Sequence, residues 1–237
     1  MFLKKKEGEC LKRLLCAVLI FTITVTFFSC AKEEVSPTAV ATVNGEVVTE
    51  EEFEYFRKKY KSQVLNECLE KFSVEYTEDF WQTEFEGTTP EEILYDRVLE
   101  ECVRAKIQFV LMKEEGIYDD ISFEGLKLKA ENFNAENENK EGVVGIKSIQ
   151  MSQFYSYYLQ TGVMELQNIY AEGKLKPDEK EVAEKIAQLA GTSDYINEED
   201  YESVALSKLK TEKYEKYIEE LYKKSEIKEI EKDGKQS

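Results

Sequence analysis

The 237-residue sequence predicts a mainly α fold with a small two-stranded pairing of an N-terminal and a C-terminal strand. Apolar residues recur every three or four positions over long stretches, which is typical of amphipathic helices. Helix-capping patterns open two of these stretches, at Thr49 and Thr89. A short apolar strand from Val40 to Asn44 needs a partner elsewhere, because one strand cannot form a sheet.

Residues 1–30 are typical of a lipoprotein signal peptide. A basic start, Lys4 to Arg13, precedes an uncharged run from Leu14 that ends at Cys30. The motif "FFSC" resembles a bacterial lipobox, whose cysteine would be lipidated and become the mature N-terminus. An ordinary cleaved signal, or an uncleaved anchor with Cys30 incidental, is the alternative. Residues 31–38 then predict a loose tether.

The charge of the chain excludes some partners. The net charge is −17, and without residues 1–30, which hold five basic and two acidic residues, 27 basic and 47 acidic residues leave −20. Such a surface does not suit nucleic acid, and it argues against docking of the domain itself on anionic lipid. An acyl group would then be the membrane anchor. No phosphate loop, dinucleotide-binding glycine pattern or zinc spacing occurs, so we expect no cofactor, metal or small-molecule substrate.

The first helix begins with Thr49 and Glu52 in the spacing of a capping box. Glutamates 50–52 suit the positive end of the helix dipole, and they therefore indicate a helix start and not a metal cluster. An apolar stripe continues from Phe53 to Phe72, about six turns.

The second helix begins at "TTPEE", with Thr89 as cap and Pro90 in the first turn, and ends at Gly116. Its apolar stripe is broad enough to predict the core of the domain. Cys68 and Cys102 fall on apolar helix faces, where cysteine commonly packs as a small hydrophobe. A disulfide between them is the alternative if the protein lies outside the cytoplasm, although two cysteines are too few for a set of disulfides that defines a fold.

The remaining segments complete one domain, residues 39–230, followed by a charged tail at 231–237. From Ile117 to Val144 the sequence is polar and rich in Asn, which predicts an exposed loop or a short helix with a mobile flank. It lacks the ligand spacing of a calcium loop. Three more helices are predicted: Ile149 to Glu172, Asp178 to Ala190, and one that starts near 197–200. The segment "SEIKEI", 225–230, is the expected partner of the first strand.

Three motifs, in order along the chain, resemble the SurA/PrsA family of extracytoplasmic foldases. "VATVNGEVVTEEEFEYF" at 40–56 is similar to the strand, Asn-Gly turn and helix start that open the family's chaperone module. "LMKEEGI" at 111–117 and "KTEKYEKYIEELYKKSEIKEI" at 210–230 resemble its later helix and its closing helix and strand. The resemblance implies a helical SurA/PrsA/trigger-factor-like chaperone domain.

The family's inserted parvulin domain, a prolyl isomerase with active-site histidines, is not expected in this chain. The sequence contains no histidine, and between Gly173 and Asn197 only one helix and a turn fit. The Ser-x-x-Lys pattern at Ser225 has no companion motifs. We therefore expect no catalytic residues and no enzymatic activity.

The resemblance implies a lipid-anchored chaperone of the bacterial cell envelope that holds unfolded or newly secreted polypeptides. Apolar contacts would bind such polypeptides without requiring a particular client sequence. The candidate contacts are Phe154, Tyr155, Tyr157 and Tyr158, for which ordinary core packing is the alternative, and Trp81, which could instead plug the core. The rival hypothesis is a surface lipoprotein that uses the same helical scaffold to bind one dedicated protein partner.

Overall fold

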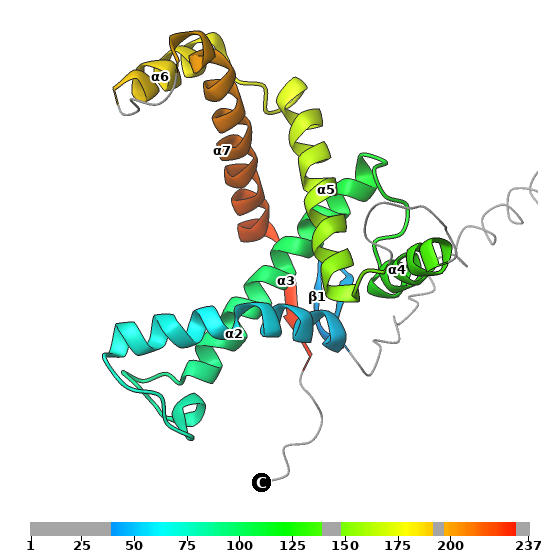
Figure 1. The fold of residues 1–237 in the computed structure, drawn as a ribbon, viewed down its shortest axis with the longest axis vertical. Coiled ribbons are helices and arrows are strands. Elements are labelled where there is room, and N and C mark those ends of the chain that lie inside the picture. Colours follow the sequence, from blue (N-terminus) through cyan, green and yellow to red (C-terminus); the bar gives the residue numbers. More distant parts are fainter. Residues whose placement is uncertain (1–38, 139–147, 192–196, 231–237) are drawn as a thin grey trace, which may run out of the picture. The chain divides into compact units, whose positions relative to one another are not determined.

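A three-stranded antiparallel sheet joins the two ends of the described chain (Figure 1). The computed structural model describes residues 39–138, 148–191 and 197–230. The predicted signal peptide with Cys30, the tether and the charged tail lie outside these residues. The strand order is β2-β1-β3, where β1 is Ala39–Val43, β2 is Glu46–Thr49 and β3 is Ile227–Glu229.

Strands β1 and β2 form a hairpin around Asn44 and Gly45. Both residues have a positive φ, 51° and 90°, which a two-residue hairpin turn requires and which Asn and Gly tolerate best. Val43 pairs with Glu46 directly across the turn. The Asn-Gly turn therefore supplies β1 with a local partner, a strand that we did not expect.

The predicted pairing of the N- and C-terminal strands is confirmed. Thr42 of β1 lies opposite Lys228 of β3. Asn44 also binds the segment before β3, since its backbone N–H donates to the Glu226 carbonyl and its side-chain oxygen accepts from the Glu226 N–H, both at 2.9 Å. The sheet thus has three strands instead of the expected two, and it joins the first and the last described segments of the chain.

Two long helices, α2 (Glu50–Phe72) and α3 (Pro90–Glu114), pack against each other. A short 3-10 helix, η1 (Phe80–Gln82), lies in their connection. The predicted capping box of α3 is present: the Thr89 hydroxyl accepts from the Glu92 N–H, and the Glu92 carboxylate accepts from the Thr89 N–H at 2.8 Å. The broad apolar face of α3 lies in the core, as expected.

Of the loop and the short helix predicted as alternatives after Ile117, the structure has a helix for residues 123–138, α4 (Phe123–Glu138). Its sequence is polar overall, but Phe123, Leu126 and Ala130 lie three and four positions apart and are buried. The apolar stripe of α4 is short, and the asparagines around it obscured the helical period.

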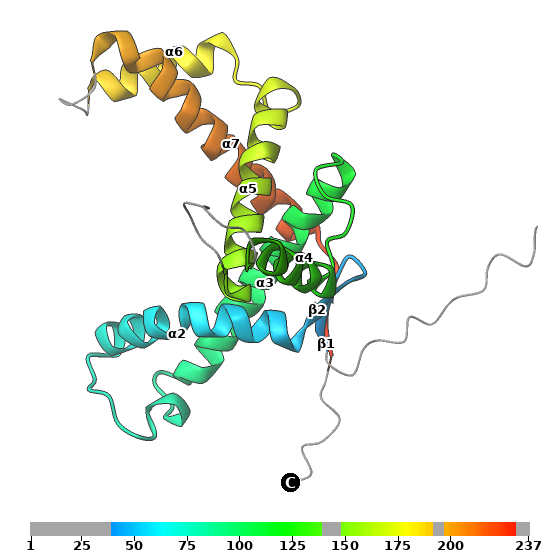
Figure 2. The same cartoon turned by 45° about the vertical axis from the view of Figure 1, so that its right-hand side comes forward.

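Helices α5 (Met151–Glu172), α6 (Glu179–Ala190) and α7 (Tyr201–Lys224) match the three predicted C-terminal helices. Helix α6 packs on α7, and Figures 1 and 2 both show the two side by side. Helix α5 contacts both α3 and α7. A Cβ atom at Gly162 of α5 would lie 2.5 Å from the Met112 sulfur, so glycine permits the close approach of α5 to α3.

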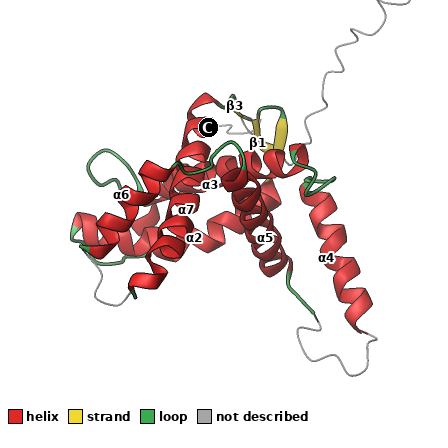
Figure 3. Cartoon of the chain, turned by 90° about the horizontal axis from the view of Figure 1, so that it is seen from above, coloured by secondary structure: helices red, strands yellow, loops and turns green. Residues whose placement is uncertain are grey.

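Figure 3 shows that the described chain is predominantly helical, with the strands gathered at one place. The core is one continuous cluster centred on α3, to which α2, α4, α5, α7 and the sheet contribute. No helix within the three described ranges is long and apolar enough to span a membrane.

Candidate functional site

The structure separates the five aromatic side chains predicted to contact clients. Tyr155 is completely buried, Phe154 and Trp81 are 7% and 8% exposed, and Tyr158 is half-buried. Only Tyr157 is largely exposed, at 62%. Successive helical residues point in directions about 100° apart, so the "FYSYY" run cannot present all its rings on one surface.

Tyr155 is a core residue, which corrects its assignment as a surface contact. Its ring packs edge-on against Phe56 of α2 and Phe109 of α3. Its hydroxyl donates a 2.6 Å hydrogen bond to Oε1 of Glu52. Burial raises the pKa of Tyr155 well above its ordinary value, and the neighbouring Glu52 carboxylate raises it further, so the hydroxyl remains a donor.

Glu52 does not close the capping box that its spacing predicts. Thr49 still caps α2, since its hydroxyl accepts from the Glu52 backbone N–H at 3.2 Å. The Glu52 carboxylate instead turns into the core, where Oε2 lies 2.8 Å from Nζ of Lys106 on α3. Both side chains are almost fully buried, at 0% and 3% exposure. A buried ion pair with a tyrosine hydroxyl therefore joins α2, α3 and α5.

Phe154 and Tyr158 hold α4 against α5. The Tyr158 ring stacks on Tyr118 with centroids 3.8 Å apart, and Phe154 contacts Phe133 of α4. Lys129 of α4 donates to the Tyr158 hydroxyl at 2.7 Å. These two aromatics thus position α4 and do not form an open client surface.

Trp81 covers the end of the core next to α2. Its ring packs edge-on against the fully buried Phe80, and the ammonium group of Lys61 lies 5.2 Å from its centroid. Of the two interpretations of Trp81, the geometry favours the plug over the contact surface.

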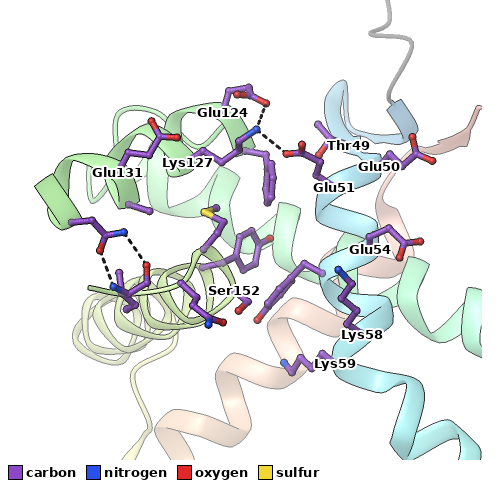
Figure 4. A pocket seen from close by; sticks show the side chains of 18 residues that line it. Thr49, Glu50, Glu51, Glu54, Lys58, Lys59, Glu124, Lys127, Glu131 and Ser152 are labelled. Carbon is purple, nitrogen blue, oxygen red and sulfur yellow. Dashed lines mark hydrogen bonds and ion pairs between the residues drawn. The ribbon is translucent and has the colours of Figure 1, made fainter. Parts of the chain in front are cut away.

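A cleft of about 1150 Å³ opens between the start of α2, helix α4 and the start of α5 (Figure 4). Its inner surface is largely apolar and is lined by Tyr55, Phe123, Ile149, Met151 and the buried Tyr155. Charged side chains surround this surface. They are Glu50, Glu51, Glu54, Lys58 and Lys59 on α2, and Glu124, Lys127 and Glu131 on α4.

An ion pair between α4 and α2 spans the cleft. Nζ of Lys127 lies 2.9 Å from Glu51 of α2 and 3.3 Å from Glu124 of α4, as the dashed lines in Figure 4 show. On the other side of the cleft, Asn134 of α4 donates to the carbonyl of Ile149 and accepts from its N–H, at 3.0 and 2.7 Å. Helix α4 is therefore attached to both other walls.

A shallower groove continues the cleft along α2 and α5. Both are lined by Tyr55, Lys59 and Ser152, and the groove also contains Tyr157. The hydroxyls of Tyr55 and Ser156, which both line the groove, form a 2.6 Å hydrogen bond between the two helices. Of the five aromatic residues predicted to contact clients, Tyr157 is therefore the one that is exposed in a groove.

Cys68 and Cys102 are both buried and both free thiols. Burial raises the pKa of the Cys102 thiol, and the nearby Glu52 carboxylate raises it further, so the reactive thiolate is disfavoured. Within the described parts of the chain, no three His, Cys, Asp or Glu side chains group closely enough to hold a metal ion.

No family model, curated protein or solved structure matches this chain. The resemblance to the foldase family therefore stays a prediction from its three motifs. The sequence singled out Glu52 only as part of a helix cap, and it did not single out Lys106 or the α4 wall of the cleft. One signal could have indicated the buried pair: Lys106 lies in step with Cys102 and Phe109 on the apolar stripe of α3.

Proposed function

We propose that the protein is a lipid-anchored holdase of the bacterial cell envelope, attached to the membrane through Cys30, which binds unfolded or newly secreted polypeptides without prolyl isomerase chemistry. The observation that carries the proposal is the open cleft between α2, α4 and α5, with its apolar inner surface and charged rim. Its supporting features are the lipobox-like motif and the three foldase-like motifs.

The size and lining of the cleft suit a segment of polypeptide. Clefts that accept drug-sized ligands measure about 300–1000 Å³. At about 1150 Å³, this cleft has room for several neighbouring side chains. Burial of apolar side chains is non-directional and favours binding without a strict sequence requirement. The charged residues around the cleft keep the protein soluble when a bound polypeptide fills the cleft only in part.

The test is suppression of aggregation. The protein starting at Ala31 is added in increasing ratio to several unrelated, chemically unfolded clients while light scattering is recorded. We expect suppression beyond that of an equally acidic helical protein. Ser152 is exposed and lines the cleft, so Ser152→Trp should obstruct it and reduce suppression severalfold.

Ser207→Trp is the matched control, because Ser207 is an exposed serine on α7 away from the cleft. This variant should suppress aggregation as the wild type does. Equal activity of both variants would remove the cleft from the mechanism. Absence of suppression with every client would overturn the holdase proposal in favour of a lipoprotein with one dedicated protein partner.

A further inference from the structure

The wall of the cleft that α2 supplies changes charge along its length. Glu50, Glu51 and Glu54 lie in the first turns, and Lys58 and Lys59 follow. Residues four positions apart lie on the same face of a helix, and all five side chains line the cleft. Figure 4 shows the carboxylates toward one end of this wall and the lysines at the other.

The other charged groups do not cancel this polarity. At the acidic end, Lys127 is shared between Glu51 and Glu124 at 2.9 and 3.3 Å. Arg57 of α2 is likewise shared between Glu54 and Glu91, at 3.3 and 2.6 Å, so each of these two cations faces two carboxylates and the end remains acidic. At the basic end, Lys58 and Lys59 are exposed and form no ion pair with the described residues. The ammonium group of Lys59 lies near the Tyr60 ring, 5.1 Å from its centroid.

The spacing of the two ends matches an extended peptide. Glu51 and Lys59 are eight helical residues apart, which is about 12 Å along the axis. Four residues of extended chain span about 13 Å, and residues at positions i, i+2 and i+4 point to the same face. The apolar side chains of Tyr55 and Met151 line the same cleft.

We propose that the cleft, in the polypeptide-binding role proposed above, selects extended segments with a basic and an acidic residue four positions apart and an apolar residue midway. The basic side chain of the segment lies near Glu50, Glu51 and Glu54. Its acidic side chain lies near Lys58 and Lys59, and the apolar side chain faces the inner surface of the cleft.

Fluorescence anisotropy of short labelled peptides tests this selection. The matching peptide has the core Lys-Ser-Phe-Ser-Glu. The comparison peptides replace both charged residues with Ser, use two Lys or two Glu, or place Lys and Glu three positions apart, where they point to opposite faces. Exposed ion pairs contribute modestly, so we expect the matching peptide to bind about fivefold tighter than each comparison peptide.

Charge reversal in the cleft sharpens the test. The double variant Lys58→Glu, Lys59→Glu makes the whole α2 wall acidic, so its preference should move to the peptide with two Lys. The double variant Lys208→Glu, Lys216→Glu changes net charge equally at exposed positions of α7 outside the cleft and should keep the wild-type preference.

The outcomes distinguish this inference from the function on which it rests. Equal affinity for all peptides, or a preference that the Lys58 and Lys59 reversal does not move, overturns the charge selection and leaves the holdase in place. Failure of every peptide to bind, together with no suppression of aggregation, overturns both.

Discussion

Glu51 and Glu52 are neighbours on α2, yet their carboxylates occupy opposite environments. The Glu51 side chain is 60% exposed and reaches across the cleft to Lys127 of α4, which is 32% exposed. The Glu52 side chain is fully buried and pairs with Lys106 of α3, with the Tyr155 hydroxyl as a second partner. One pair spans the opening of the cleft, and the other lies in the core beneath it.

The difference shows how one helix start can serve both stability and binding. A buried pair is costly to break, because the partner left behind is an uncompensated charge in a medium of low polarity. An exposed pair contributes little, since water and salt screen it. The α2, α3 and α5 junction beneath the cleft is therefore fixed, whereas the link from α2 to α4 across the opening is weak.

Lys106→Met should have the largest effect. It leaves the Glu52 carboxylate buried without its cation, so we expect a loss of about 3–5 kcal/mol in the free energy of unfolding, measured by urea titration. The triple variant Glu52→Leu, Lys106→Met, Tyr155→Phe removes both charges and the hydroxyl that donates to Glu52, and it should recover most of that loss. If the single variant loses less than about 1 kcal/mol, the pair is not buried as described.

Tyr155→Phe should have an intermediate effect. It removes the hydroxyl that donates to Glu52 and keeps the ring, and hydrogen bonds to charged groups contribute roughly 1.5–3 kcal/mol. The folded-state pKa of Tyr155 is raised, so its contribution is present below the unfolded value of about 10 and is lost as pH rises above it.

The measurement compares urea unfolding of the wild type and Tyr155→Phe at neutral and alkaline pH. The wild type should lose more stability than the variant above about pH 10. Tyr157→Phe is a suitable control, because Tyr157 is exposed, and it should match the wild type at both pH values. An identical pH response of Tyr155→Phe and wild type would contradict the role given to the hydroxyl.

Lys127→Ala should have the smallest effect, a change below about 1 kcal/mol in the free energy of unfolding that shrinks further at high salt. Lys180→Ala, which removes the exposed pair of Lys180 and Glu184 within α6, is the control and should behave similarly. If Lys127→Ala loses as much stability as Lys106→Met, the exposed ion pairs of Lys127 stabilise the fold as strongly as the buried pair. That result would contradict the distinction between the two pairs.

The sequence predicted the helices whose signals are local. Capping residues and apolar periods located α2, α3, α5, α6 and α7, and the lone first strand pointed to its C-terminal partner. The sequence left α4 undecided between a loop and a short helix, because the apolar positions from Phe123 to Ala130 are few and the rest of the segment is polar.

The candidate site was harder to predict, because its parts come from separate elements. Thr49 and Glu52 satisfy the capping pattern, but only the folded chain shows that the Glu52 carboxylate has a better partner in Lys106. The aromatic run on α5 was recognised, but the direction of each ring was not, so Tyr155 was assigned to a surface although it lies in the core.

The most direct test of the central claim, that the cleft holds polypeptide, is photo-crosslinking to an unfolded client. A photoreactive amino acid is placed at position 152 in the cleft or, as a control, at position 207 on α7. We predict crosslinks to several unrelated clients from position 152 and few from position 207. Equal yields from both positions, or none from position 152, would contradict the account.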